Sequence, residues 1–342
     1  MRRIAQRSLS GALALAWLGW VGSAAADDPP IVPWSALLPG LTTTYEPSSA
    51  NLCQAGQLRC VDAVIREMTS RFDALEATCD HNTLFALTYL RTTEQYELAV
   101  VQPGFFGDPN FINHQDANFA RLYFDAWDNY RAGALGSVPR AWQLAFASAD
   151  QKKVNGTGNI LLGMSAHVNR DLPVVLAAIG LVKPDGSSRK PDHDKVNVFL
   201  NQVIEPLFDE AAARYDPLVD DAQIDGTQLD EAALLQILVG WREQAWRNAE
   251  ALVSAATPAA RALVQAQIEQ TAAIEANLII VATAYAPLSV QQALAELAGL
   301  PVDPLRVQQA LVDRNVNLLH GVLGTLLTPG AIVRDRYCAA HG

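Results

Sequence analysis

The sequence predicts an all-α protein, a single domain of nine or ten helices behind an extended N-terminal lead-in. Two observations support this fold class. Apolar residues recur at helical spacing through most of the chain after residue 60, and no alternating run bounded by hairpin turns is found. We expect a signal peptide at 1–26, a lead-in at 27–58 and an all-helical domain at 59–342. A further boundary within that domain is considered near 216–228.

The first 26 residues have the pattern of a secretory signal peptide. A basic region with Arg2, Arg3 and Arg7 precedes an apolar stretch at 9–21, and the small residues 24–26 suit a cleavage site. No later stretch reaches about 18 unbroken apolar residues, so no transmembrane segment is expected. We therefore expect a periplasmic or secreted protein.

Helices are expected in order along the remaining chain. A stripe of apolar residues marks 61–75, a second helix covers 81–101, and Pro103-Gly104 ends it. An aromatic, amphipathic helix covers 111–130, and Pro139 opens a short helix to Phe146. A largely apolar helix at 160–179 follows. The remaining helices are expected at 192–215, 230–254, 258–284, 290–298 and 304–327.

The four cysteines favour disulfides, because an even number lies in a chain expected to enter an oxidising compartment. Four cysteines allow three pairings. We expect Cys53–Cys60 as a local link and Cys79–Cys338 as a long-range link. Metal binding by these residues is not expected, since no CxxC spacing occurs.

The charge balance restricts the class of partner. The net charge is −11, and loss of the basic signal segment makes the mature chain more acidic. An acidic surface argues against nucleic acid as an electrostatic partner. It is compatible with a small-molecule or lipid-like substrate and with a metal ion. The oligomeric state is not predicted.

His167 and Asp171 are the strongest candidates for a functional site. They lie four residues apart in the apolar helix at 160–179, so they share one helix face. Both residue types bind metals, and burying them costs several kcal/mol unless they are compensated. Pro173 cannot donate to the carbonyl of Asn169, so a kink beside Asp171 is expected. The alternative is a structural His–Asp hydrogen bond.

Asp192-His193-Asp194 forms a second cluster, at the start of the helix expected at 192–215. It follows the first helix after a short loop, so the two helices are expected to be antiparallel neighbours. His193 is a candidate metal ligand and Asp192 a candidate catalytic carboxylate. The alternative for Asp192 is an ordinary N-cap.

Asn113-His114-Gln115-Asp116 forms a third cluster, in which Asp116 is a candidate catalytic carboxylate. The alternative is a solvated helix start. Glu243 is also considered, either near Arg170 or in surface pairs with Arg242 and Arg247. No Walker lysine, Gly-x-Ser-x-Gly or HExxH motif is present.

The sequence resembles a bacterial family known mainly as a domain of unknown function. The resemblance covers about residues 60–255 and rests on the segments 161–173, 190–197, 138–142 and 116–123. It implies an all-helical fold.

A more distant resemblance is to the zinc-dependent phospholipase C and single-strand nuclease superfamily, through His167, Asp171 and Pro173. In that superfamily the His and Asp are metal ligands. This sequence departs from the pattern, because no Trp stands at the expected new terminus and Val174-Val175 follow the proline.

Two functions are therefore considered. The first is a secreted hydrolase that depends on a divalent metal, with zinc expected. His167, Asp171 and His193 would hold the metal, and Asp116 or Asp192 would act as general base on a metal-activated water. The second is a non-enzymatic carrier of an apolar ligand, whose cavity is lined by the aromatic helix around residues 119–127. The alternative for those aromatic residues is plain core packing.

Overall fold

The computed structural model describes residues 41–216, 219, 229–285 and 331–342. Within these ranges the protein is all-α, as predicted, and contains no strand. Two isolated β-bridges, Val154 with Ala284 and Val182 with Ser188, are the only extended pairings there. The signal segment and the helices expected at 290–298 and 304–327 lie outside the described residues, as does most of the boundary considered near 216–228.

The structure describes twelve helical elements. They are α1 (Leu58–Glu76), α2 (Thr83–Val100), α3 (Pro109–Arg131), η2 (Leu135–Ser137), α4 (Arg140–Asp150), α5 (Gly156–Ser165), η3 (Ala166–Asp171), α6 (Leu172–Ile179), α7 (Lys190–Arg214), α8 (Leu229–Ser254), α9 (Pro258–Thr283) and α13 (Ala331–His341).

Most expected helices are confirmed with ends within a few residues. α7 begins at Lys190, two residues before the expected start, and runs on through Pro206 as expected; the helix expected from residue 160 begins at Gly156. The helix α13 was missed altogether, because its sequence has no strong apolar stripe. It packs against α7 near the C-terminus.

The expected kink before Pro173 takes the form of a π-helix. η3 separates α5 from α6, and the backbone N–H of Leu172 donates to the carbonyl of His167, five residues earlier. Pro173 cannot donate in the following turn, which favours an irregular hydrogen-bond ladder at this point. All six residues of η3 are buried, so its polar side chains face partners inside the protein.

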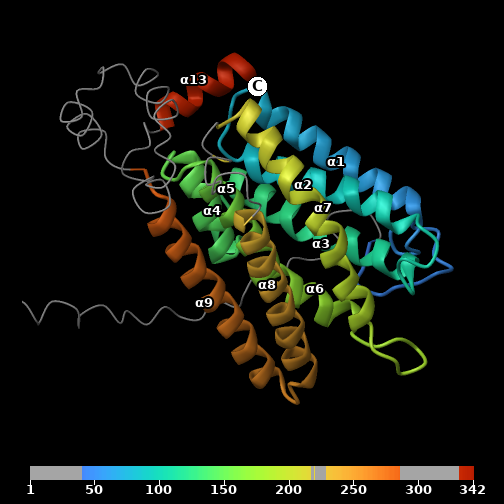
Figure 1. The fold of residues 1–342 in the computed structure, drawn as a ribbon. Helices are drawn as coiled ribbons and strands as arrows, with labels where there is room; N and C mark the ends of the chain where they lie inside the picture. Colours follow the sequence, from blue (N-terminus) through green and yellow to red (C-terminus); the bar gives the residue numbers. More distant parts are fainter. Residues whose placement is uncertain (1–40, 217–218, 220–228, 286–330) are drawn as a thin grey trace, which may run out of the picture.

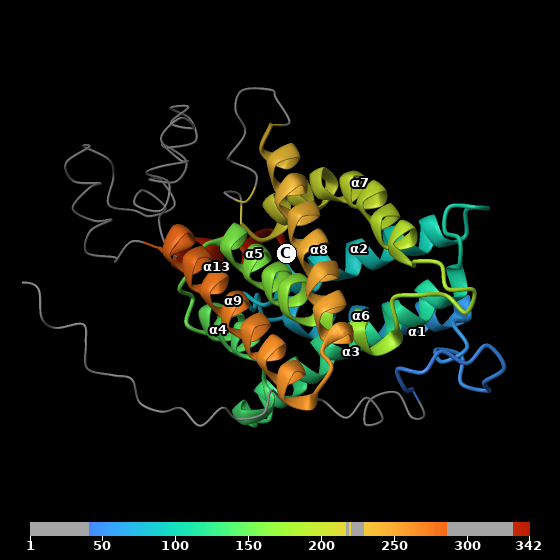
Figure 2. The ribbon, with the colours of Figure 1, turned by 90° about the horizontal axis from the view of Figure 1, so that it is seen from below.

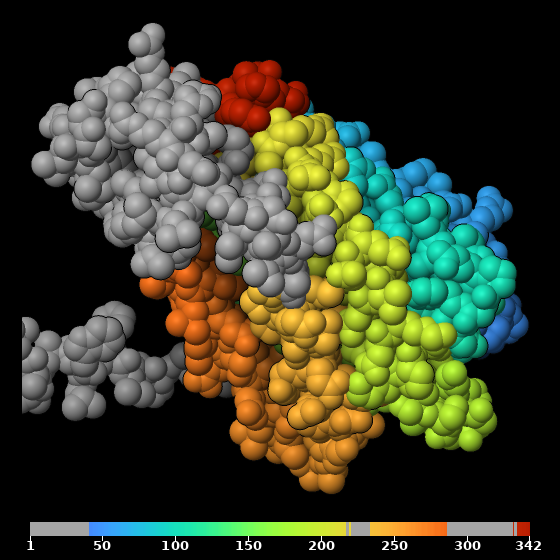
Figure 3. All heavy atoms as spheres, in the orientation of Figure 1, coloured from blue at the N-terminus to red at the C-terminus, as the bar shows by residue number. Residues whose placement is uncertain are grey.

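The core lies between two groups of helices. α2 packs against α1, α5 and α7, while α8 packs against α6, α7 and α9 (Figures 1 and 2). α7, α8 and α9 are visible together on one face of the molecule (Figure 3). The contact between α2 and α5 depends on Gly163, because a Cβ there would lie 2.2 Å from the ring of Phe85. A methyl group at this position would force the two helices apart.

Both expected disulfides are confirmed. Cys53–Cys60 links the lead-in to the first turn of α1, and Cys79–Cys338 joins the end of the α1 region to α13. Residues 41–57 form turns and bends, as expected for the lead-in. Two disulfides fit a protein exported to an oxidising compartment. Among the described helices, none has the length and apolar content needed to span a membrane.

Candidate functional site

Asp171 lies at the centre of a closed hydrogen-bond network. Its side chain is fully buried. Oδ2 accepts from Trp142 Nε1 at 2.8 Å and lies 3.1 Å from His167 Nδ1, while Oδ1 accepts from Arg170 Nη1 at 2.8 Å. Arg170 also donates through Nε to Glu269 at 2.6 Å. Both carboxylate oxygens of Asp171 therefore have protein partners.

His167 is held in one orientation by this network. Because an ionised carboxylate only accepts hydrogen bonds, Nδ1 carries the hydrogen and Nε2 keeps its lone pair. The ring stacks on Phe119 with centroids 3.5 Å apart and contacts Tyr89 edge-on at 4.5 Å. Burial lowers the pKa of His167 below its usual value, although the Asp171 carboxylate opposes this shift. His167 is therefore neutral at neutral pH, and its buried Nε2 has no hydrogen-bond partner among the residues that the structure describes.

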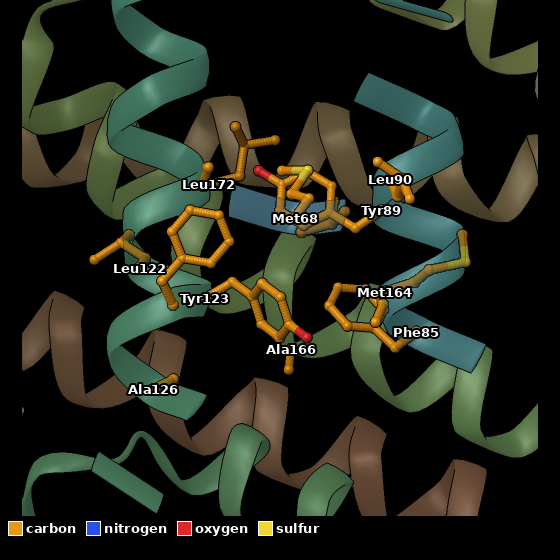
Figure 4. Packing of buried hydrophobic residues seen from close by; sticks show 14 of the residues in the cluster. Met68, Phe85, Tyr89, Leu90, Leu122, Tyr123, Ala126, Met164, Ala166 and Leu172 are labelled. Atoms are coloured by element: carbon orange, nitrogen blue, oxygen red, sulfur yellow. The ribbon is translucent and has the colours of Figure 1, made fainter. Parts of the chain in front are cut away.

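A cavity of about 120 Å³ lies beside His167. Its wall comes from α2, α3, the α5–η3–α6 segment, α7 and α8, and most of its residues are apolar. Thr88, Thr92 and Thr93 add no free donors, because each hydroxyl donates to a carbonyl one turn earlier in α2. Figure 4 shows part of this region, where Phe85 and Tyr89 of α2 approach Tyr123 of α3.

Asp116 lies in the same cavity wall as His167. The helix that carries it begins at Pro109, capped by Asp108, so the alternative of a solvated helix start for this cluster was wrong. Burial raises the pKa of Asp116 to about 7. Within the described ranges, its buried Oδ2 has no hydrogen-bond partner, and neither has the hydroxyl of Tyr89. His167, Asp116 and Tyr89, which line one largely apolar cavity, thus each hold a polar atom that the described residues leave unpaired.

Arg242 is the one arginine or lysine among the residues that line the cavity. Its Nε donates to Asn197 Oδ1 at 2.8 Å, and its Nη2 donates to the backbone carbonyl of His193 at 2.6 Å. These partners are neutral. Among the described residues, no carboxylate lies within ion-pair distance of this guanidinium, and burial lowers the pKa of Arg242 to about 10.

His193 supports Arg242 and is not free to bind a ligand. Its Nε2 lies 3.2 Å from the backbone carbonyl of Arg242, and its Nδ1 lies 3.4 Å from Arg242 Nη2. Burial, helped by the charge of Arg242, lowers the pKa of His193 well below its usual value. The imidazole is therefore neutral, donating through Nε2 and accepting at Nδ1.

Asp192 has a structural role that differs from both alternatives considered for it. Its two oxygens accept from the backbone N–H groups of Gly107 and Asp108, at 2.6 and 3.1 Å. It thereby fixes the loop before α3 and does not cap its own helix. The two helix segments that carry His167 and His193 pack mainly through α8 rather than directly on each other, so the expectation of close neighbours was wrong.

The residues expected to hold zinc do not fit a shared metal site. Asp171 has both oxygens occupied, and His193 is bonded to Arg242. Within the described ranges, no group of three or more His, Cys, Asp or Glu side chains is placed to hold a metal ion. We therefore derive no chemical step through a metal.

Several residues of this region were missed from the sequence. Glu243 was expected in surface pairs with Arg242 or Arg247; its pair with Arg247 is confirmed and Lys190 is a second partner, but Arg242 is buried and contacts the cavity instead. The spacing of buried Leu238, Arg242 and Trp246 along α8 is the signal that places Arg242 on the core face. Of the aromatic helix, Phe119 lines the cavity, whereas Trp127 belongs to the core.

Comparison with known protein families matches residues 61–282 to a family of unknown function, DUF5995. The chain belongs to this family. The DUF5995 match includes the whole α5–η3–α6 segment and every residue that lines the cavity. Neither the curated proteins nor the solved structures gave a match. The similarity to the zinc phospholipase C and nuclease superfamily stays a prediction.

Proposed function

We propose that this protein binds a small, mainly apolar molecule in the cavity beside His167. The observation that carries the proposal is that three residues lining this largely apolar cavity each hold a buried polar atom with no hydrogen-bond partner in the described part of the chain: His167 Nε2, Asp116 Oδ2 and the Tyr89 hydroxyl. A buried polar atom without a partner costs about 1–3 kcal/mol. A ligand with an apolar body and a polar group would recover part of that cost.

The cavity size restricts the ligand to about one ring or a short branched chain. An apolar protein cavity of roughly 150 Å³ binds benzene. The cavity here is about 120 Å³, which is close to that size. Long-chain lipids would need a larger space, so the lipid-like substrate considered from the sequence is less well supported than a small aromatic or aliphatic molecule.

Binding of benzene and toluene, measured by isothermal titration calorimetry on the purified protein, tests the proposal. Val196 lines the cavity, and Val198 lies on the same helix with 54% of its surface exposed. Val196→Phe should abolish binding by filling the cavity, whereas Val198→Phe should bind like the wild type. Absence of binding to the wild type, or equal binding by both variants, contradicts the proposal.

The geometry of His167 favours a second candidate, a hydrolase in which His167 is the general base and not the metal ligand expected from the sequence. Asp171 fixes the imidazole through Nδ1 and leaves Nε2 as a base, and Asp116 lines the same cavity. A positioned general base contributes about 10²–10⁴-fold to a rate. In this candidate the base removes a proton from the attacking water.

A panel of p-nitrophenyl acetate, p-nitrophenyl butyrate and bis-p-nitrophenyl phosphate tests the hydrolase, with and without EDTA. His167→Gln should lower any turnover at least about 100-fold, while its circular dichroism spectrum stays like that of the wild type. Metal analysis of the same samples tests the divalent ion expected from the sequence. Turnover that His167→Gln leaves unchanged excludes this role.

A further inference from the structure

We infer that the ligand of this cavity carries one carboxylate group and that Arg242 binds it. This inference rests on the proposed function and names the chemical class of the ligand. Its basis is a buried guanidinium on an apolar cavity wall, held by hydrogen bonds to neutral atoms and without a carboxylate partner among the described residues.

The charge of Arg242 needs a counter-ion that the described part of the protein does not supply. Arg242 is 6% exposed. An unpaired charge in such an environment costs several kcal/mol, even when neutral groups donate or accept hydrogen bonds around it. Asp194 acts on it only at longer range and is itself exposed and paired with Lys190 at 2.8 Å.

Arg170 shows how this protein treats a buried guanidinium that has no ligand to bind. Arg170 is also buried, and it has two carboxylate partners, Asp171 at 2.8 Å and Glu269 at 2.6 Å. Arg170 lies outside the cavity wall, whereas Arg242 lines it. The guanidinium that lacks a carboxylate is thus the one that a ligand in the cavity can reach.

The surroundings of Arg242 favour a carboxylate over a phosphate. Guanidinium groups bind a planar carboxylate through two parallel N–H donors. A phosphate monoester carries nearly two negative charges at neutral pH, and Arg242 is the single cationic residue among those that line the cavity. Together with the cavity size, this points to a monocyclic or short-chain carboxylate.

His193 and Asn197 hold the Arg242 side chain in position. Asn197 accepts from Nε, and the His193 carbonyl accepts from Nη2, so one side of the guanidinium is fixed. No hydrogen bond of Nη1 is found among the described residues, which leaves donor capacity for a ligand. His193 is therefore a positioning residue in this inference.

The experiment compares benzoate, its neutral isostere benzamide, and phenyl phosphate, using calorimetry at pH 7.5 with benzene as the reference for an intact cavity. We expect the wild type to bind benzoate at least about tenfold more tightly than benzamide or phenyl phosphate. Arg242→Met should lose the preference for benzoate over benzamide. Arg242→Lys, which keeps the charge, should retain part of that preference.

The outcomes separate this inference from the proposed function. Binding of benzene without a preference for benzoate over benzamide overturns the inference that the ligand carries a carboxylate. That result leaves the proposed function in place. Tighter binding of phenyl phosphate overturns it in favour of a phosphate ligand. Absence of all binding overturns both. If Arg242→Met does not fold, the wild-type ratio of benzoate to benzamide affinity and the Arg242→Lys variant decide the question.

Discussion

Arg170 and Arg242, two of the five arginines buried in the described part of the chain, lie in opposite electrostatic environments. Arg170, on the π-helix η3, has two carboxylate partners; burial lowers its pKa, but the charges of Glu269 and Asp171 outweigh this effect and raise it. Arg242, on α8, contacts neutral acceptors, and its pKa falls to about 10. Arg170 is neutralised by its own carboxylate partners, whereas Arg242 leaves charge and hydrogen-bonding capacity beside a cavity. This difference separates a structural network from a candidate binding site.

The largest expected effect comes from removing each arginine in turn. Arg170→Met should lower the free energy of unfolding by about 3–5 kcal/mol, because it leaves buried carboxylates without their cation. Arg242→Met should lower it by less than about 2 kcal/mol, because the lost hydrogen bonds are offset by removal of an unpaired charge. Urea denaturation followed by circular dichroism measures both values. Equal losses would show that the two regions do not differ as described.

A pH series sharpens the comparison between Asp171 and Asp116. Both carboxylate oxygens of Asp171 accept hydrogen bonds, whereas Oδ2 of Asp116 has no partner among the described residues. Burial raises the pKa of Asp116 to about 7, so the folded state holds a proton that the unfolded chain releases above about pH 4. The free energy of unfolding that protonated Asp116 contributes is therefore complete below the pKa of the unfolded state. This contribution is lost as the pH rises through about 7.

The wild type should therefore lose about 2 kcal/mol more of its free energy of unfolding between pH 5 and 7 than Asp116→Asn does. The measurement is the free energy of unfolding at both pH values for the wild type and the variant. Asp125, whose pKa burial also raises to about 7, remains in both proteins and cancels in the difference. Identical pH dependence in the two proteins contradicts a buried, unpaired Asp116.

The next effect concerns His193, which connects α7 to Arg242. His193→Leu should cost about 0.5–1.5 kcal/mol of unfolding free energy, because the backbone carbonyl of Arg242, which lies inside α8, loses the additional hydrogen bond from the His193 side chain. His193→Gln should cost less, since its amide can donate in place of Nε2. Thermal or urea denaturation distinguishes the two variants. A larger cost for glutamine than for leucine would argue against this hydrogen bond.

The smallest effect is expected at Glu243, on the surface of α8. Glu243 pairs with Lys190 at 2.8 Å and with Arg247 at 3.1 Å, and its side chain is 38% exposed. Exposed ion pairs contribute about 0–1 kcal/mol. Glu243→Gln should therefore change the free energy of unfolding by less than about 1 kcal/mol. A loss as large as that of Arg170→Met would contradict the contrast between buried and exposed charges.

The fold was more predictable than the site. Apolar periodicity and the Pro-Gly stops gave the all-α class and most helices, because these patterns are local. The pairing of His167 with Asp171 was also expected, since four residues separate them on one helix. The irregular turn before Pro173 was expected as a kink and is present as a π-helix.

The remaining site depends on tertiary contacts that spacing does not encode. Trp142, from α4, occupies an oxygen of Asp171 that was expected to bind metal, and Asp192 reaches the loop before α3. Arg242 was missed because its neighbour Glu243 is exposed and suggested a surface face. The cavity is lined by side chains from five helical segments. The packing of those segments, and not their order in the chain, determines which side chains meet.

The link between Cys79 and Cys338 has a consequence for proteolysis of this protein. These cysteines are 259 positions apart, so most of the chain forms one covalent loop. A single cleavage anywhere within that loop leaves both fragments in one molecule. Nicked protein would migrate as a single species on a non-reducing gel and separate into two bands only after a reductant is added.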